Sequence, residues 1–321
     1  MKYHSQKILP KKIILVDGIL RTGKLLTGTL ISSFHNTEHL EFTENIDNFA
    51  HGIEFNKIEI DYAKSFISSY LNELIYNKYL SRRVNFRPTD RTGVPNSINF
   101  KTYKKRLKNN EGDSVLKLIK KENKQIPLIS HNMMLVINSL NKLEINYKMI
   151  ELFRNPINIA MSWFNRNYGN RFGKDQRVFS MLINKNNRVY PWFHASLDNK
   201  FHNLNELEKC VDYVCLLTKR SIDNYKKLNQ NQKKRIFIST YERIVEDTEK
   251  EIKQIAKFLN LKTTKFTPKF IKKEKFPKKF DKNRLDQNRF YIKTNVKKKY
   301  YNKLISLEKS FNKNVHNLLG K

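Results

Sequence analysis

The sequence of 321 residues has few cysteines and no long apolar run. Cys210 and Cys215 are its only cysteines, too few and too badly spaced for a disulfide scaffold or a zinc site, so we expect reduced core thiols. The first apolar stretch, Ile13–Val16, is too short for a signal peptide, and no later segment approaches the roughly 20 apolar residues of a membrane helix. These absences predict a soluble, cytoplasmic protein.

Acidic residues are scarce relative to basic ones. The chain has 63 Lys and Arg against 30 Asp and Glu, a formal net charge of +33. Such an excess can bind polyanions, but here it is mostly lysine, spread along the chain among many Asn and Ile, as AT-rich coding alone would also produce. An anionic substrate or partner and compositional drift therefore both remain open. The densest run, 262–299, fits a basic loop, a solvated face or a flap over an anionic ligand, and its phenylalanines argue against full disorder.

Short apolar runs alternate with helical patterns along the chain. Strands are predicted at 11–17, 39–42, 126–130, 149–153 and 235–239, and helices at 25–34, 58–80, from Pro156 onward, 203–228, 247–259 and 296–319. Near-continuous apolar strands between helices predict an α/β fold, a three-layer sandwich with a central, mainly parallel five-stranded sheet flanked by helices, like that of P-loop NTPases. Without internal repeats, we expect a single domain, 1–321, with acceptor-side insertions at 82–125 and 166–202.

The segment Met149–Arg166 (MIELFRNPINIAMSWFNR) places Arg154 where a strand becomes a helix. Pro156 suits the first helical position and Asn155 the N-cap. Free amides at this point favour an anion, and the guanidinium of Arg154 offers a fork for phosphate oxygens. Arg-Asn-Pro, followed after five residues by Ser162-Trp163, resembles the 3′-phosphate-binding motif of sulfotransferases that use 3′-phosphoadenosine 5′-phosphosulfate (PAPS).

The stretch Gly18–Thr27 (GILRTGKLLT) follows the first predicted strand, and its amides can cradle a phosphate at the start of a helix. It departs from a Walker A sequence at Leu25, where a nucleoside triphosphatase needs a hydroxyl for magnesium, and no strand makes a clear Walker B. The loop also resembles the 5′-phosphosulfate loop of sulfotransferases, which it matches at Arg21, Thr22 and Gly23 and leaves at Lys24 and Leu25, where the family usually has two hydroxyl residues.

His131 directly follows the strand predicted at 126–130, which we expect beside the strand of the phosphate loop. A neutral imidazole accepts protons at physiological pH. Cytosolic-type sulfotransferases carry their catalytic base at about this distance before the arginine of the 3′-phosphate motif, so the resemblance implies that His131 is the base. Glu38, Glu41 and Glu44 are alternatives, because other branches of the family use a glutamate just after the second strand.

The fifth strand leads into Tyr241–Asp247 (YERIVED), where Asp247 is expected to cap the next helix. The stretch resembles a Tyr-Glu-Asp segment of sulfotransferases, with Arg243 where an acid is common, and the resemblance implies that Tyr241 approaches the adenine. The family also has a late basic loop, commonly Arg-Lys-Gly. Residues 278–280 (KKF) stand in its place without the glycine.

The resemblance implies a sulfotransferase that moves the sulfuryl group of PAPS, without a metal, to a hydroxyl or amine. A carbohydrate or glycan acceptor is expected, on which Trp163, Trp192 and Phe193 would stack unless they pack in the core. His131 would be the base, with Arg21 and Lys24 offsetting charge. The nucleotide-binding residues would be Gly18, Arg21, Thr22, Gly23, Lys24, Arg154, Ser162 and Tyr241. Two alternatives remain: a P-loop kinase of a small metabolite using Mg-ATP, and a non-enzymatic nucleic-acid-binding protein.

Overall fold

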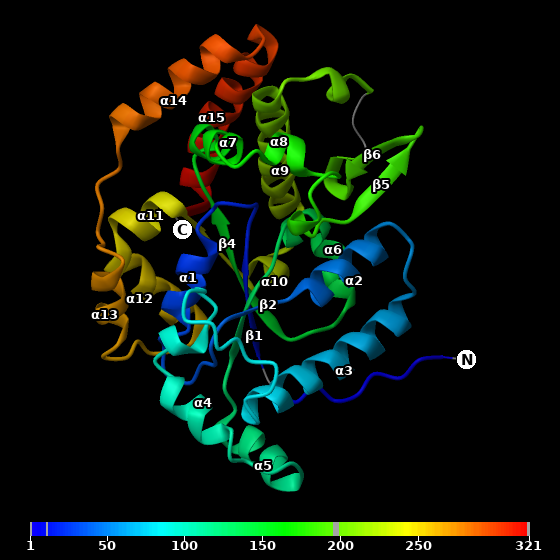
Figure 1. Ribbon diagram of the computed structural model, residues 1–321, viewed down its shortest axis with the longest axis vertical. Helices are drawn as coiled ribbons and strands as arrows, with labels where there is room; N and C mark the ends of the chain where they lie inside the picture. The colour runs from blue at the N-terminus through cyan, green and yellow to red at the C-terminus, as the bar shows by residue number, and fades with distance from the viewer. Residues whose placement is uncertain (1, 11, 195–198, 320–321) are drawn as a thin grey trace. The chain divides into compact units, whose positions relative to one another are not determined.

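Figure 1 shows the computed structural model, which describes residues 2–10, 12–194 and 199–319. The chain separates into two units built from interleaved segments. Unit 1 comprises Met1–Gly18, Gly23–Leu152 and Leu228–Lys278, and unit 2 comprises Ile19–Thr22, Phe153–Lys227 and Lys279–Lys321. The expectation of a single domain stays a prediction.

Unit 1 is built on a five-stranded sheet in the order β2-β3-β1-β4-β7. Its strands are β1 Ile13–Asp17, β2 Glu41–Phe42, β3 Ile126–Ile129, β4 Tyr147–Phe153 and β7 Ile236–Thr240. β1 runs parallel to both β3 and β4, and β2 runs parallel to β3. Every residue of β1 and β3 is buried, which explains why these strands are continuous apolar runs rather than alternating patterns. The predicted sheet, with β3 beside β1, is confirmed.

Helices of unit 1 cover both faces of this sheet (Figure 1). One face carries α1 Lys24–Ile31, α12 Thr248–Leu259 and α13 Thr267–Lys273, and the other carries α2 Glu44–Glu54, α3 Ile60–Tyr79 and α6 Ile137–Lys142. Unit 1 also contains α4 Phe100–Arg106, α5 Asp113–Glu122, α10 Gln230–Lys233, α11 Tyr241–Glu246 and the 3₁₀ turns η1 Val94–Asn96 and η2 Met133–Val136. The predicted three-layer α/β arrangement is therefore confirmed.

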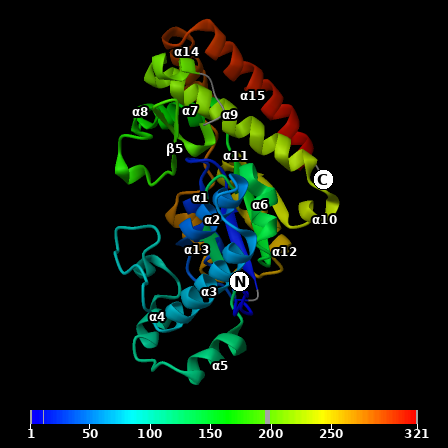
Figure 2. The ribbon, with the colours of Figure 1, turned by 90° about the vertical axis from the view of Figure 1, so that its right-hand side faces the viewer.

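Unit 2 consists mainly of helices, with α9 Glu206–Lys227 and α15 Lys298–Leu319 lying side by side (Figures 1 and 2). It also contains α7 Pro156–Phe164, α8 Tyr168–Arg171, α14 Lys282–Asn295, the antiparallel hairpin of β5 Leu182–Lys185 and β6 Arg188–Pro191, and the 3₁₀ turns η3 Gln176–Val178, η4 Trp192–His194 and η5 Asn199–Asn203. Cys210 and Cys215 on α9 are buried free thiols, as expected.

The structure corrects several local expectations. The helix predicted at 58–80 begins two residues later, at Ile60, the first residue of α3. Asp247 stands at the N-cap of α12, but its side chain makes no capping hydrogen bond. The basic segment 262–299 is largely helical, in α13, α14 and the start of α15, and Phe270 and Phe276 pack against the core of unit 1. The second strand is shorter than predicted, and Lys11 lies outside the described residues.

Candidate active site

The phosphate-loop candidate begins and ends on glycines with positive φ in unit 1. Gly18 has φ 136° and Gly23 has φ 94°, values that side chains strongly disfavour. A Cβ atom at Gly23 would also lie 2.8 Å from the ring of Tyr241, the first residue of α11. Glycine at position 23 therefore serves both the turn and the close packing of Tyr241 on the loop. The sequence assigned Tyr241 to the nucleotide site, and the structure places it on this loop.

Lys24, the first residue of α1, is only 6 % exposed. Its Nζ donates a hydrogen bond to the backbone oxygen of Gly18 at 2.5 Å, so the ammonium group closes the loop on itself. Burial lowers the pKa of Lys24 to about 8, although the negative charges of Asp17, Asp47 and Glu151 oppose this shift. Lys24 is thus a buried structural cation of the loop, and its predicted contact with a phosphosulfate stays a prediction.

His131 follows β3 and lies against α2 and β2. Its backbone N–H donates to Oδ2 of Asp47 at 2.9 Å, and Nδ1 of its ring lies 3.5 Å from the same oxygen. The ring stacks on Phe42 with centroids 6.0 Å apart and planes 12° from parallel. Burial and the Lys24 ammonium lower the pKa of His131 well below its ordinary value. The lowered pKa makes His131 a neutral imidazole at physiological pH. Solvent still reaches it, because 31 % of its side chain is exposed.

Asp47 is the main residue of this site that the sequence did not reveal. It lies on α2 and is 6 % exposed, with Ile46, Ala50 and Ile53 buried around it on the same helix. Burial and the nearby Asp17 raise the pKa of Asp47 well above its ordinary value, against the opposing effect of Lys24. The signal in the sequence that could have revealed Asp47 is an acidic residue among the apolar positions of an amphipathic helix.

A second pair of buried carboxyl groups lies between the central strands. Asp17 on β1 is in register with Glu151 on β4. Ser130 Oγ and the backbone N–H of Met134 donate to the two oxygens of Asp17, at 2.9 and 3.2 Å. Burial and the charge of Asp17 raise the pKa of Glu151 well above its ordinary value. Both carboxyl groups lie close enough to Lys24 to oppose the lowering of its pKa.

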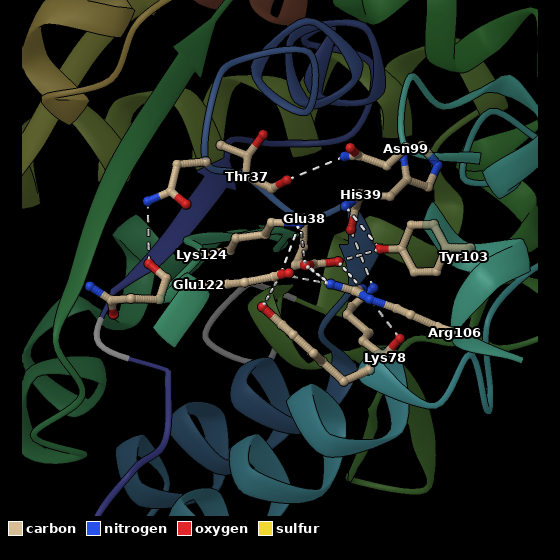
Figure 3. Close-up of polar contacts among 12 residues, drawn as sticks. Thr37, Glu38, His39, Lys78, Asn99, Tyr103, Arg106, Glu122 and Lys124 are labelled. Atoms are coloured by element: carbon tan, nitrogen blue, oxygen red, sulfur yellow. Dashed lines mark hydrogen bonds and ion pairs between the residues drawn. The ribbon is translucent and has the colours of Figure 1, made fainter. Parts of the chain in front are cut away.

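The alternative bases Glu38, Glu41 and Glu44 have different surroundings. Figure 3 shows Glu38 at the centre of a polar network. Arg106 donates to both of its oxygens at 2.9 Å and Tyr103 to one at 2.6 Å. Burial alone would raise the pKa of Glu38, but Arg106 lowers it to about 2. These contacts give Glu38 a structural role.

Glu41 and Glu44 have other surroundings than Glu38. Glu41 pairs with Lys78 at 2.6 Å, whereas Glu44 is an exposed residue at the start of α2. The choice of His131 as the base stays a prediction.

The residues of the Arg-Asn-Pro motif come together in unit 2. Arg154 Nη1 donates to the backbone oxygen of Arg21 at 2.9 Å, and Arg21 Nε donates to Ser162 Oγ at 3.2 Å. Trp163 Nε1 donates to the backbone oxygen of Leu20 at 2.9 Å. Arg154, Arg21 and Ser162 thus lie close together at helix α7 and the residue before its N-cap. Ser162, a weak candidate on its own, is in direct contact with the loop residue Arg21.

Asn155 caps α7 as predicted. Its side-chain oxygen accepts from the amides of Ile157 and Asn158 at 3.0 and 3.3 Å, and its Nδ2 donates to Glu308 on α15 at 2.9 Å. Arg289 on α14 donates to the same carboxylate. The start of α7, directly after Arg154, is therefore fixed from both sides. Thr22 is also buried and bonds to the oxygen of Ile19 at 2.9 Å, which holds the loop turn.

Residues 11–317 match the family model of the sulfotransferase domain, which is nearly the whole chain. The protein belongs to the sulfotransferase family. This membership selects the sulfotransferase interpretation over the kinase and nucleic-acid-binding alternatives, and the protein is a transferase of sulfuryl groups. No curated protein shows a significant sequence match to it.

Solved sulfotransferase structures resemble the chain weakly. A sulfotransferase domain from the curacin biosynthetic pathway is 14 % identical with a TM-score of 0.44, over 81 % of this chain and 77 % of that one. A sulfotransferase domain from the Synechococcus PCC 7002 olefin synthase is 12 % identical with a TM-score of 0.45, over 97 and 98 %. The sulfotransferase STF9 from Mycobacterium avium is 12 % identical with a TM-score of 0.40, over 91 and 78 %.

The aromatic residues suggested for sugar stacking are buried in this sulfotransferase. Trp163, Trp192 and Phe193 are all less than a tenth exposed. Trp163 and Phe193 pack edge-on or tilted against Tyr213 of α9, with centroids 6.1 and 5.3 Å apart. The stacking prediction for these three side chains is therefore wrong, because they form the aromatic core of unit 2.

The predicted acceptor-side insertions take definite conformations in the sulfotransferase. In 82–125, Arg91 pairs with Glu274 and Arg87 with Asp90, and α4 and α5 follow. The insertion 166–202 contains the β5–β6 hairpin, and its residues 195–198 lie outside the described residues. Within the described residues, no cluster of three His, Cys, Asp or Glu side chains is arranged to hold a metal ion. In the same part of the chain, no helix is long and apolar enough to span a membrane.

Proposed function

We propose that this sulfotransferase takes the sulfuryl group from PAPS and transfers it to a hydroxyl group, or less favourably an amine, of a carbohydrate or glycan acceptor. One observation carries the choice of donor: Arg154 and Ser162, the two ends of the 3′-phosphate motif, both contact Arg21 of the loop. Two guanidinium groups and a hydroxyl at one place suit a phosphate group. The loop Gly18–Lys24, which leads into the N-terminus of α1, suits the phosphosulfate.

His131 would act as the general base in the transfer. The acceptor oxygen forms a bond to sulfur while the bond from sulfur to the bridging oxygen breaks, and the electron pair leaves with 3′,5′-adenosine bisphosphate. His131 takes the acceptor's proton on an unprotonated ring nitrogen, which its lowered pKa keeps available at neutral pH. Arg21 and the loop amides offset the charge that grows on the leaving oxygens, a task of positioning and electrostatics.

Polar and basic residues of the insertion 82–125 support a carbohydrate acceptor. Segment 82–125 is rich in Arg, Lys and Asn. Its residue Tyr103 is buried and donates a hydrogen bond to Glu38. Polar groups that can bond to hydroxyls suit a sugar better than an apolar acceptor. A cytoplasmic location and a small-molecule or glycan partner, without nucleic acid, stay predictions.

Release of 3′,5′-adenosine bisphosphate from PAPS tests this proposal. Wild type and His131→Gln are assayed with panels of carbohydrates, phenols and amines. We expect release with carbohydrates that falls about 100-fold or more in the variant, the usual contribution of a general base. Release with phenols alone would contradict the acceptor class, and undiminished release in His131→Gln would contradict the base.

A further inference from the structure

The buried carboxylate of Asp47 lies against the edge of the His131 ring that carries Nδ1. Oδ2 accepts the backbone N–H of His131 at 2.9 Å and lies 3.5 Å from Nδ1. These contacts join α2 to the residue after β3 across 84 positions of sequence. We propose that Asp47 is a positioning residue for His131, which keeps the proton of the neutral ring on Nδ1 and leaves Nε2 free to accept the proton of the acceptor. The inference rests on the proposed role of His131 as base.

Two contacts restrain the orientation of the His131 ring. Its peptide N–H is bound to the same oxygen that Nδ1 faces, and its flat side stacks on Phe42. Nε2 is on the ring edge opposite Nδ1. A neutral imidazole carries one proton on either nitrogen, and a carboxylate at Nδ1 selects the tautomer whose free lone pair is on Nε2. This orientation is what a general base needs before the acceptor arrives.

The charges around Asp47 explain why a carboxylate is useful at this position. Lys24 on α1 is the nearby cation that disfavours a second positive charge on His131, and His51 on α2 adds to this effect. Asp17 on β1 and Glu44 on α2 are the acidic neighbours of Asp47. When His131 takes a proton, the carboxylate of Asp47 is the group in contact that offsets the new charge. Without it, proton transfer would create an imidazolium whose charge the Lys24 ammonium disfavours.

Asp47 is costly as a purely structural residue. Among the described residues, its Oδ1 has no hydrogen-bond partner although the side chain is 6 % exposed. A buried carboxylate oxygen without a hydrogen-bond partner destabilises a fold. Residues with this property are found where function and stability compete.

Nitrogen-15 NMR of the imidazole rings in the full chain tests the proposal without any substrate. His131 is assigned by the signal that disappears in His131→Gln. The wild-type ring is expected to be protonated on Nδ1 and unprotonated on Nε2. In Asp47→Asn this preference should be lost, whereas Asp113→Asn, at an exposed position on α5, should leave it unchanged. A wild-type ring that is protonated on Nε2 instead would overturn the proposal.

Kinetics with PAPS and the best carbohydrate of the panel give a second readout. Asp47→Asn should lower kcat about 100-fold or more with little change in the KM for PAPS, and Asp47→Glu should restore part of the loss. If His131→Gln is inactive while Asp47→Asn keeps both kcat and the tautomer, only the positioning role falls. If His131→Gln keeps full activity, the proposed base itself is wrong.

Discussion

The pKa values of three buried carboxyl groups of unit 1 shift in opposite directions, because one faces a cation and two face another carboxylate. Glu38 faces the guanidinium of Arg106, which holds its pKa at about 2. Asp47 and Glu151 face another carboxylate, Asp17, and burial raises both pKa values. The pKa of the same chemical group is therefore lowered at one position and raised at two others, and the nearby charge decides the direction.

Glu38→Gln should lower the free energy of unfolding by about 3.5 kcal/mol at pH 7, because the pKa of Glu38 falls from 4.5 to about 2 on folding and each pKa unit corresponds to about 1.4 kcal/mol. Because the folded-state pKa lies below the ordinary value of 4.5, this stabilisation is complete above about pH 4.5 and disappears as the pH falls towards 2. Urea unfolding at several pH values measures it. Glu249→Gln, at an exposed position of α12, is the control, and equal losses in both variants would contradict the account.

At the scale of elements, the sequence predicts the strands best because parallel strands covered on both faces are continuous apolar runs. The N-cap Asn155 followed from local chemistry, since its bonds span two and three residues. The β5–β6 hairpin was missed although its two-residue loop, Asn186-Asn187, has positive φ at both positions, as asparagine-rich hairpin turns do. Contacts such as Asp47 with His131 could not be predicted, because they join segments far apart in sequence.

Asn155→Ala should lower the free energy of unfolding by about 2 kcal/mol, about half from the lost cap and half from the lost bond to Glu308. Asn155→Ser should lose less, because serine still caps α7. Urea unfolding of the two variants beside wild type measures the difference. Equal losses in both would show that the cap contributes nothing.

At the scale of the whole molecule, a net charge of +33 attracts any polyanion without implying a specific partner. The charge was clear from composition, but composition could not choose between function and drift. The family match settles the class of reaction, while the acceptor stays a proposal because no side-chain pattern identifies it.

Binding of a single-stranded DNA oligonucleotide should be sensitive to salt and indifferent to sequence. Raising the salt from about 50 to about 200 mM should weaken it about 300-fold or more if six or more phosphates are contacted. Fluorescence anisotropy with two unrelated oligonucleotides measures this. Tight binding of one sequence at the higher salt would restore the nucleic-acid interpretation.

The most direct test of the central claim is calorimetric titration with 3′,5′-adenosine bisphosphate, without metal, and separately with ATP and magnesium. Wild type should bind the bisphosphate, and Arg154→Ala should bind it about 10- to 100-fold more weakly, the value of a lost charged hydrogen bond. Arg235→Ala, an exposed arginine at the other end of the strands, should bind like wild type. Binding of ATP with magnesium alone, or unchanged bisphosphate binding in Arg154→Ala, would contradict the account.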